Sequence, residues 1–561
     1  MRRFVPMVFL LAACGGGDAA PRADLVLRGA TVYTGEGDGA AQAIAVREGR
    51  IVWVGAEADA EAWIDAGTEV RDLTGRVIYP GFVDAHAHFG GIGQRELTLN
   101  LEGTDTKDAF LTRLEEAVAR TPKGEWVTGR GWIETFWDPP VFPTRHDLDR
   151  IAPDHPVLLT RADGHASIAN SAALRLAGVT GATPAPPGGA INLDVDGEPT
   201  GMLIDRAQAL VRRHVPETST AQLERAMELA SERSVRLGWT QVHDMHGSWD
   251  EVAMMRRLYD QDRIKVRLYK TISGPGEQAD SLIALGPQPP EFDDRFELRA
   301  IKIVVDGALG SRGAALLDPY SDDPATLGLI TTDTVAVKAM LRAALRGGIQ
   351  VAGHAIGDRA NRLLLDLYGD ALAAVPTAER AIAEPRWRNE HSQIVQPADL
   401  PRFAELGVIA SMQPSHAIGD LHFVPSRIGL DRTAGAYAWH SLLELGVPVA
   451  GGSDAPVERG EPMIEFYAAV ARKDLQGRDG PGWHPEERVT REQALAMFTR
   501  YPAFAAFAED RAGTIAVGKR ADFTILDRDI MVIPEPEILQ ATNVMTVIGG
   551  RIVYDATSGS P

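Results

Sequence analysis

The sequence contains very little cysteine and no excess of positive charge. Its 561 residues include a single cysteine, Cys14, which excludes a disulfide framework and any zinc or iron–sulfur site built from several cysteines. Its 57 basic side chains are outnumbered by 77 acidic ones, which gives a formal net charge of −20. Because phosphate contacts require a basic surface patch, we expect no nucleic-acid partner.

A hydrophobic run long enough to span a membrane is also missing. The apolar run at residues 4–13 has about ten residues, whereas a spanning helix needs roughly twenty. This run follows Met1-Arg2-Arg3 and ends at Cys14, an arrangement that resembles the signal of a bacterial lipoprotein. We therefore expect a signal peptide over residues 1–13, lipid on Cys14 and a flexible tether over residues 14–22. The alternative is a frayed N-terminus in which the cysteine occurs by chance.

These features predict where the protein is found. We expect it to be exported and lipid-anchored to a bacterial membrane, on the outer membrane and facing the periplasm. The N-terminal lipid would be its only contact with the membrane. The sequence does not define the oligomeric state, and a homo-oligomer is compatible with it.

Short β-strands occur at both ends of the chain. Apolar runs separated by glycine turns lie between residues 23 and 55, and similar runs lie at 521–526 and 544–554, the last with a Gly549-Gly550 turn. Each piece alone is too small to bury a core, so we predict one composite β-sandwich domain from residues 23–79 and 505–561. Two independent β modules are the alternative.

The middle of the chain, residues 80–504, alternates apolar strands with helical stretches. This alternation indicates a parallel sheet within an α/β fold, and eight such strands fit a closed (β/α)8 TIM barrel. An open doubly wound sheet is the competing fold, but the sequence has no Gly-x-Gly-x-x-Gly turn to support it. The predicted strands are 82–85, 240–242, 265–269, 300–305, 349–352, 388–390, 408–411 and 447–451. The predicted helices include 220–237, 334–346 and 358–372.

The interval after the first barrel strand, residues 94–237, is too long for a single loop, so we expect an insertion with its own structure. An insertion at this position lies at the C-terminal face, where the active sites of barrels are found. Trp132 and His165 are its candidate substrate contacts, although such aromatic residues more often belong to a core.

The clearest chemical signal is Asp84-Ala85-His86-Ala87-His88, at the end of the first predicted barrel strand. Side chains at positions i and i+2 of a strand point the same way, so His86 and His88 converge, about 7 Å apart along the chain. Neutral imidazole is the commonest metal ligand in proteins. Alone, a His-x-His pair is weak evidence, because such pairs also occur by chance on surfaces.

Three further ligand-type residues follow later strands in the same way. His354, His391 and Asp454 each come at the C-terminal end of a predicted strand, and a barrel brings these ends together. Four histidines and a carboxylate at one barrel mouth predict a metal centre. Nitrogen and oxygen ligands without sulfur favour zinc, with manganese, iron or cobalt as alternatives.

At this point the sequence resembles the amidohydrolase superfamily, in its family 3 branch of YtcJ-like proteins and N-substituted formamide deformylases. The resemblance covers nearly all of the chain after the signal segment. The motifs that carry it are Pro80–His88 (PGFVDAHAH), Ile301–Arg312 (IKIVVDGALGSR), His354–Ala360 (HAIGDRA), Asn389–His391 (NEH), Gly452–Val457 (GSDAPV) and Gly513–Ile515 with Gly518–Asp522.

The resemblance implies a role for each candidate ligand. His86, His88 and Asp454 would bind one metal, and His354 and His391 would bind a second. Lys302 stands where members of the superfamily often carry a carbamylated lysine that bridges two ions. An unmodified lysine paired with a carboxylate, and hence a single metal ion, is the alternative.

The implied chemistry is hydrolysis of a small molecule. A divalent ion acidifies water, and Asp454 would accept its proton as the general base and pass it to the leaving nitrogen. Asp306, Ser311 and Arg312 are expected to contact the substrate or to support the ligands, although Arg312 could equally form a structural salt bridge. Ala455 is smaller than the residue common in the family, which predicts a wider pocket.

We therefore expect a metal-dependent hydrolase that acts on a carbon–nitrogen bond other than a peptide bond, in an amide or an N-substituted formamide. Deamination, or ester or lactone hydrolysis, at the same centre is an alternative, because pocket shape decides the leaving group. A lipoprotein that only binds a solute or a metal is a third reading. The intact ligand set argues against it, since a binder has no use for a general base beside an open metal position.

Overall fold

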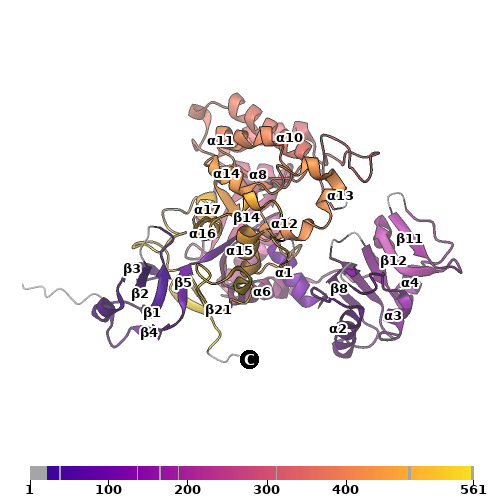
Figure 1. Cartoon of the computed structure of the whole chain (residues 1–561), viewed down its shortest axis with the longest axis horizontal. Helices are drawn as coiled ribbons and strands as arrows, with labels where there is room; N and C mark the ends of the chain where they lie inside the picture. Colours follow the sequence, from indigo (N-terminus) through magenta and orange to yellow (C-terminus); the bar gives the residue numbers. More distant parts are fainter. Residues whose placement is uncertain are drawn as a thin grey trace, which may run out of the picture.

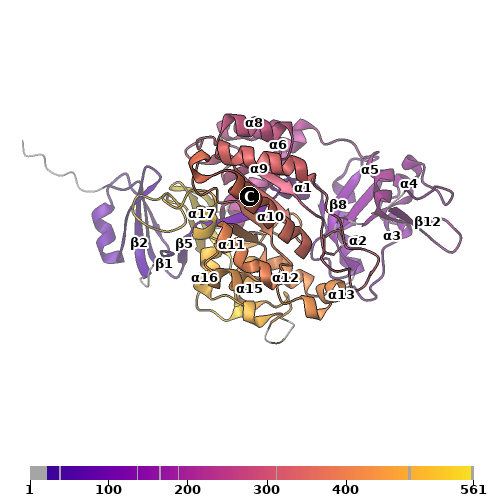
Figure 2. The ribbon, with the colours of Figure 1, turned by 90° about the horizontal axis from the view of Figure 1, so that it is seen from above.

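A computed structural model describes residues 22–557, apart from 37–39, 135–136, 163, 165, 187–188, 311, 478–479 and 481. Figures 1 and 2 show a central barrel with a small sheet on one side and an inserted domain on the other. The expected signal peptide and Cys14 lie outside the described residues. In the part of the chain that is described, no helix is both long and apolar enough to cross a membrane.

The central barrel has eight parallel strands, paired in the order β19-β18-β17-β16-β15-β14-β13-β6. The two end strands, β19 and β6, also lie in contact, so the sheet is nearly closed. Its strands are buried on both faces, as expected where helices surround a parallel sheet. The strands are β6 (Phe82–Ala87), β13 (Trp239–Asp244), β14 (Arg267–Ser273), β15 (Phe296–Val304), β16 (Gln350–Ala355), β17 (Arg388–His391), β18 (Ile409–Met412) and β19 (Val449–Gly451). The predicted barrel is confirmed.

Helices follow most of the barrel strands and cover the outside of the sheet (Figure 2). Helix α6 covers the residues predicted for it. Ser219 and Gln222 form a capping box at its start, and Gly238, with a φ of 102°, ends it. The helices of the barrel domain are α1 (Phe89–Leu97), α6 (Thr220–Leu237), α7 (Trp249–Asp260), α8 (Glu277–Leu285), α9 (Thr334–Gly347), α10 (Asp358–Ala374), α11 (Leu400–Leu406), α12 (Pro414–Asp420), α13 (Val424–Ile428), α14 (Trp439–Glu444), α15 (Pro462–Ala471), α16 (Arg491–Met497) and α17 (Arg500–Ala505).

The small domain combines strands from both ends of the chain, as predicted. Its strands pair as one continuous mixed sheet in the order β22-β21-β20-β5-β1-β2-β3, with β4 beside β1, rather than as two separately paired sheets. The C-terminal hairpin turns at Gly549-Gly550. The strands are β1 (Leu25–Tyr33), β2 (Ala40–Arg47), β3 (Arg50–Gly55), β4 (Glu69–Asp72), β5 (Val77–Pro80), β20 (Phe523–Leu526), β21 (Asn543–Ile548) and β22 (Arg551–Asp555); α18 (Glu535–Ile538) lies between β20 and β21.

The insertion has a sheet and a hydrophobic core of its own. Its six strands pair in the order β11-β12-β10-β9-β8-β7, and Figure 1 shows this sheet beside the barrel. Trp132 and Trp137 pack against Phe110 in its core. The elements are β7 (Leu99–Asn100), α2 (Lys107–Arg120), β8 (Val127–Trp132), α3 (Arg145–Asp149), β9 (Val157–Arg161), β10 (Ala166–Ala169), α4 (Ser171–Ala177), β11 (Gly189–Leu193), β12 (Pro199–Asp205) and α5 (Ala209–Arg212).

Candidate metal centre

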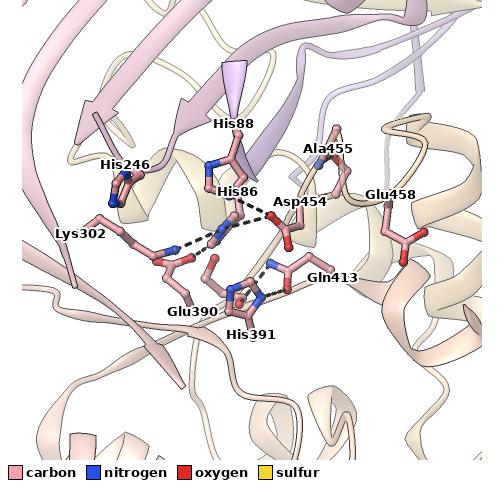
Figure 3. Close-up of polar contacts among 12 residues, drawn as sticks. His86, His88, His246, Lys302, Glu390, His391, Gln413, Asp454, Ala455 and Glu458 are labelled. Atoms are coloured by element: carbon pink, nitrogen blue, oxygen red, sulfur yellow. Dashed lines mark hydrogen bonds and ion pairs between the residues drawn. The ribbon is translucent and has the colours of Figure 1, made fainter. Parts of the chain in front are cut away.

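Three ligand-type side chains meet at the C-terminal mouth of the barrel. His86 is the penultimate residue of β6, His391 ends β17 and Asp454 follows β19. One potential ligand atom from each of the three lies within 4.8 Å of the others, and all three residues are buried. Figure 3 shows the two imidazoles and the carboxylate facing a common point.

His88 stands beside this group on the solvent side. Its Nε2 lies 3.1 Å from Oδ1 of Asp454, and the Nε2 of His86 lies 3.6 Å from the same oxygen. The His88 side chain is 38% exposed, whereas that of His86 is fully buried. The two histidines of the His-x-His pair thus approach the same carboxylate oxygen, one from inside the barrel and one from its mouth.

Lys302 and His354 complete the group that the sequence singles out. The Nζ of Lys302, on β15, lies 3.2 Å from Nε2 of His86. The His354 ring, on β16, lies 4.5 Å from the His391 ring. The fold therefore brings all six predicted ligands to one end of the barrel, although they span more than 350 positions of the sequence.

The donor set fits a divalent metal ion. The Nε2 of His354 is buried without a hydrogen-bond partner in the described structure, and it lies 3.4 Å from Oδ1 of Asp306. A buried polar atom left without a partner is destabilising, and a metal ion would satisfy it. Imidazole nitrogens with a carboxylate oxygen suit zinc and related metals.

Burial sets the charge of these groups. It lowers the pKa of His86 to about 3, and the charge of nearby Lys302 adds to the effect, so the imidazole is neutral and can offer a lone pair. Burial also lowers the pKa of Lys302, to about 8, which makes its neutral amine accessible near physiological pH. For Asp454, burial alone would raise the pKa, but the hydrogen bond of His88 and the neighbouring imidazoles outweigh it and hold the pKa well below its ordinary value.

A buried charge pair supports His86 from behind. Oε2 of Glu390 lies 2.6 Å from Nδ1 of His86 and accepts from Nη2 of Arg388 at 3.1 Å, and Oε1 of Glu390 lies 2.7 Å from Nε of the same guanidinium. Contacts of this kind fix the tautomer and the orientation of a metal-binding histidine. On the other side of the site, Nδ1 of His391 lies 2.9 Å from Oε1 of Gln413.

Sequence reasoning did not assign these supporting residues. Glu390 belongs to a motif quoted above, but its role depends on its position beneath His86. The available signal was the pair of charged residues at 388 and 390, which lie two apart on a short strand that is otherwise expected to be buried. Gln413 follows β18 and carried no comparable signal.

The residues predicted to contact the substrate or support the ligands differ in what they contact. Asp306 is buried, and its carboxylate accepts from the backbone N–H groups of Ala315, Ile356 and Gly357, so it braces the loops beside His354. Arg312 forms a two-pronged ion pair with Asp322, the structural alternative considered above.

Trp132 is fully buried in the core of the insertion, where its Nε1 donates to the carbonyl of Leu159. Its side chain therefore contributes to packing and has no surface to offer a substrate in this structure. Ser311 and His165 lie outside the described residues, so their roles stay predictions.

Two further residues near the mouth, His243 and Ala455, are buried. His243 is buried, and its Nδ1 lies 2.9 Å from Nη1 of Arg388, so it belongs to the layer behind the ligands. Ala455 is buried and packs against Gly460, where an added Cβ would approach the Ala455 side chain to 2.8 Å, and the wider pocket expected at this position stays a prediction.

Comparison with known proteins places the chain in a family. The profile described as "Amidohydrolase family", for family 3 of the amidohydrolases, matches residues 69–554. The chain belongs to the amidohydrolase family. The resemblance inferred from the motifs is thus confirmed.

Relatives in this family align over nearly their whole length. The chain is 34% identical to YtcJ of Bacillus subtilis (strain 168), with 94% of this chain and 99% of that protein covered. It is 30% identical to the N-substituted formamide deformylase of Arthrobacter pascens, with 95% of this chain and 99% of that protein covered. Among solved structures, an uncharacterized metal-dependent hydrolase from Pyrococcus furiosus is 28% identical, with a TM-score of 0.70 over 91% of this chain and 100% of that chain.

Proposed function

We propose that this amidohydrolase cleaves a carbon–nitrogen bond other than a peptide bond, in an amide or an N-substituted formamide. The observation that carries the proposal is the buried convergence of His86, His391 and Asp454 at the barrel mouth. The relative from Arthrobacter pascens, named as an N-substituted formamide deformylase, supports this class of substrate.

The ligands in this proposal are those the sequence predicts. His86, His88 and Asp454 would hold one divalent ion, and His354 with His391 would hold a second. A divalent ion in such a site acidifies water and polarises a carbonyl group. Zinc suits these ligands, and the proposal covers one or two ions.

Asp454 is the proposed general base. Its depressed pKa keeps the carboxylate ionised, so it can accept a proton from the water that attacks the amide carbon. The same carboxyl group then returns the proton to the leaving nitrogen as the carbon–nitrogen bond breaks. The products are a carboxylic acid, or formic acid from a formamide, and the free amine.

Lys302 is proposed to react with carbon dioxide. Only a neutral amine can do so, and burial lowers the pKa of Lys302 to about 8. The resulting carbamate would exchange a buried positive charge for two oxygen ligands. The contact between Lys302 and His86 supports this proposal, because a carbamate on Lys302 would lie beside the ligand set.

The test combines metal analysis with turnover, using protein that begins at Cys14. We expect bound zinc, activity on an amide or formamide panel that is lost with a chelator and restored by zinc, and a carbamate carbon signal after exposure to ¹³C-labelled bicarbonate. Asp454→Asn should lower kcat by roughly 10²- to 10⁴-fold, the usual contribution of a general base, while most of the metal stays bound.

Asp370→Asn is the matched control, because Asp370 lies on the outside of α10, exposed and paired with Lys338. It should retain the activity of the unmodified protein. Turnover of deaminase or ester substrates alone would replace the proposed reaction with the alternative one. Full activity of Asp454→Asn would refute the assigned base. Lipid on Cys14 and the periplasmic location stay predictions.

A further inference from the structure

A second polar cluster lies beside Asp454, built from α12 and from the loops that follow β17 and β19. Its centre is His416 of α12, a residue only 7% exposed. The Nδ1 of His416 lies 3.2 Å from Nε2 of Gln393, which also donates to Oδ2 of Asp420 and contacts the hydroxyl of Tyr437. An amide nitrogen can only donate, so Nδ1 of His416 is an acceptor and the ring proton is on Nε2.

This proton points toward the candidate active site without a hydrogen-bond partner among the described residues. Oδ2 of Asp454 is 3.7 Å from Nε2 of His416, and Oε1 of Glu458 is 3.9 Å from it. Both distances exceed that of a hydrogen bond. A buried donor without an acceptor is destabilising, and an oxygen atom of a bound substrate would satisfy it.

Glu458 forms the other half of the cluster. Its side chain is 29% exposed, so the carboxylate is accessible from the mouth, and Figure 3 shows it beside Asp454 and Ala455. Gly419 of α12 lies close to the carboxyl group of Glu458. A Cβ added at Gly419 would be 3.6 Å from Oε1 of Glu458.

No described lysine or arginine forms an ion pair with this carboxylate. Arg95 is nearby, but its guanidinium contacts the carboxylate of Glu102 and the backbone carbonyls of Glu458 and Arg459. Burial, together with the neighbouring carboxylates of Asp420, Glu465, Asp454 and Glu102, raises the pKa of Glu458 well above its ordinary value. A cation bound beside this carboxyl group would favour its ionised form and relieve the repulsion from the other carboxylates.

We propose that Glu458 and His416 form a specificity subsite for amides or formamides that carry a protonated amino group. The carboxylate of Glu458 pairs with the ammonium group, and Nε2–H of His416 donates to an oxygen of the substrate. Gln393, Asp420 and Tyr437 act as positioning residues, because they hold the His416 ring in the donating orientation. This inference rests on the proposed function and adds the charge of the substrate to it.

The experiment uses three formamides of matched length. Each has a formylated nitrogen on a four-carbon chain, which ends in an ammonium group (monoformyl putrescine), a methyl group (N-pentylformamide) or a carboxylate (N-formyl aminovalerate). We expect kcat/KM to be highest for the ammonium probe and lowest for the carboxylate probe. Glu458→Gln should reduce the ratio of the ammonium to the methyl probe by about 10- to 100-fold, as expected for loss of a charge-assisted contact.

Glu461→Gln is the matched control. It removes the same charge three positions along the loop, where Glu461 pairs with Arg459, and should leave the ratio unchanged. His416→Phe should lower kcat/KM for all three probes by a similar factor of about tenfold, because its donor contacts an oxygen common to them. Unchanged selectivity in Glu458→Gln, or an equal loss of selectivity in Glu461→Gln, would overturn the proposal.

Binding separates this inference from the proposed function. Calorimetry of the three probes with Asp454→Asn protein measures affinity when turnover is blocked. Tighter binding of the ammonium probe, lost in the Asp454→Asn/Glu458→Gln double variant, supports the subsite even if no probe is hydrolysed. Equal affinity of both proteins for the ammonium probe overturns the subsite, whatever the activity measurements show.

Discussion

The buried charge pair beneath His86 allows a quantitative prediction. Glu390→Gln preserves the shape of the side chain but removes its negative charge. In the native structure one oxygen of Glu390 lies 2.7 Å from Nε of Arg388 and the other lies 2.6 Å from Nδ1 of His86. Both the Arg388 and the Glu390 side chains are fully buried. The substitution therefore leaves the guanidinium of Arg388 without a counter-charge.

The size of the effect follows from the other partners of Arg388. Its guanidinium also contacts the carbonyl of Ala85, the hydroxyl of Ser411 and a ring nitrogen of His243, none of which carries a negative charge. Removing one partner of such a buried pair typically destabilises a protein by about 3–5 kcal/mol. The loss of the contact to His86 should in addition weaken metal binding by about 10- to 100-fold, the usual effect of losing a group that orients a metal-binding histidine.

The assay compares urea unfolding and zinc affinity, the latter by competition with a chelator. Glu379→Gln is the control, because Glu379 pairs with Arg346 where both side chains are about half exposed, and a surface pair contributes only about 0–1 kcal/mol. If Glu390→Gln destabilises the protein no more than Glu379→Gln and binds zinc equally well, the buried pair does not have the role we assign to it.

Two further predictions concern stability. Burial raises the pKa of Glu465 from 4.5 to about 8, so the stability that its protonated carboxyl contributes is present below pH 4.5 and is lost as the pH rises toward 8. The stability of Glu465→Gln relative to the unmodified protein should therefore rise between about pH 5 and pH 8, by at most about 1.4 kcal/mol per pH unit, as measured by thermal unfolding. A difference in stability that does not change with pH would refute the shift. Gly93→Ala should destabilise by about 3 kcal/mol or more, because its Cβ would lie 1.6 Å from the carbonyl oxygen of Ala226 on α6. Gly90→Ala, where nothing lies within 4 Å, should be neutral or stabilise α1 by up to about 1 kcal/mol, and equal melting temperatures for the two variants would refute the clash.

Much of the fold was predictable because it depends on local patterns. The apolar strands at Phe82–Ala87 and Gln350–Ala355 alternate with amphipathic helices such as Thr220–Leu237, and this pattern is sufficient to indicate a parallel barrel. The spacing of His86 and His88 indicates a pair of metal ligands, because it places both imidazoles on one face of a strand end. The composite small domain was predictable as well, because its two halves are each too small to bury a core.

The pairing of the small sheet was less accessible from sequence. Residues 25–27 and 31–33 look like two strands, yet they form the single strand β1, whose register with β2 shifts between Arg28 and Val32. Strand alternation cannot distinguish a bulged strand from two strands, since both leave the same apolar pattern.

The tertiary structure alone decided how the candidate site is supported. The sequence by itself determined the barrel, the position of the candidate ligands at strand ends and the family to which they point. It did not determine that Glu390 lies under His86, that Trp132 is buried in the insertion core, or that His416 and Glu458 face each other beside Asp454. Such contacts join residues far apart in the chain, and their distances depend on how the strands and loops pack at the barrel mouth, which no local spacing encodes.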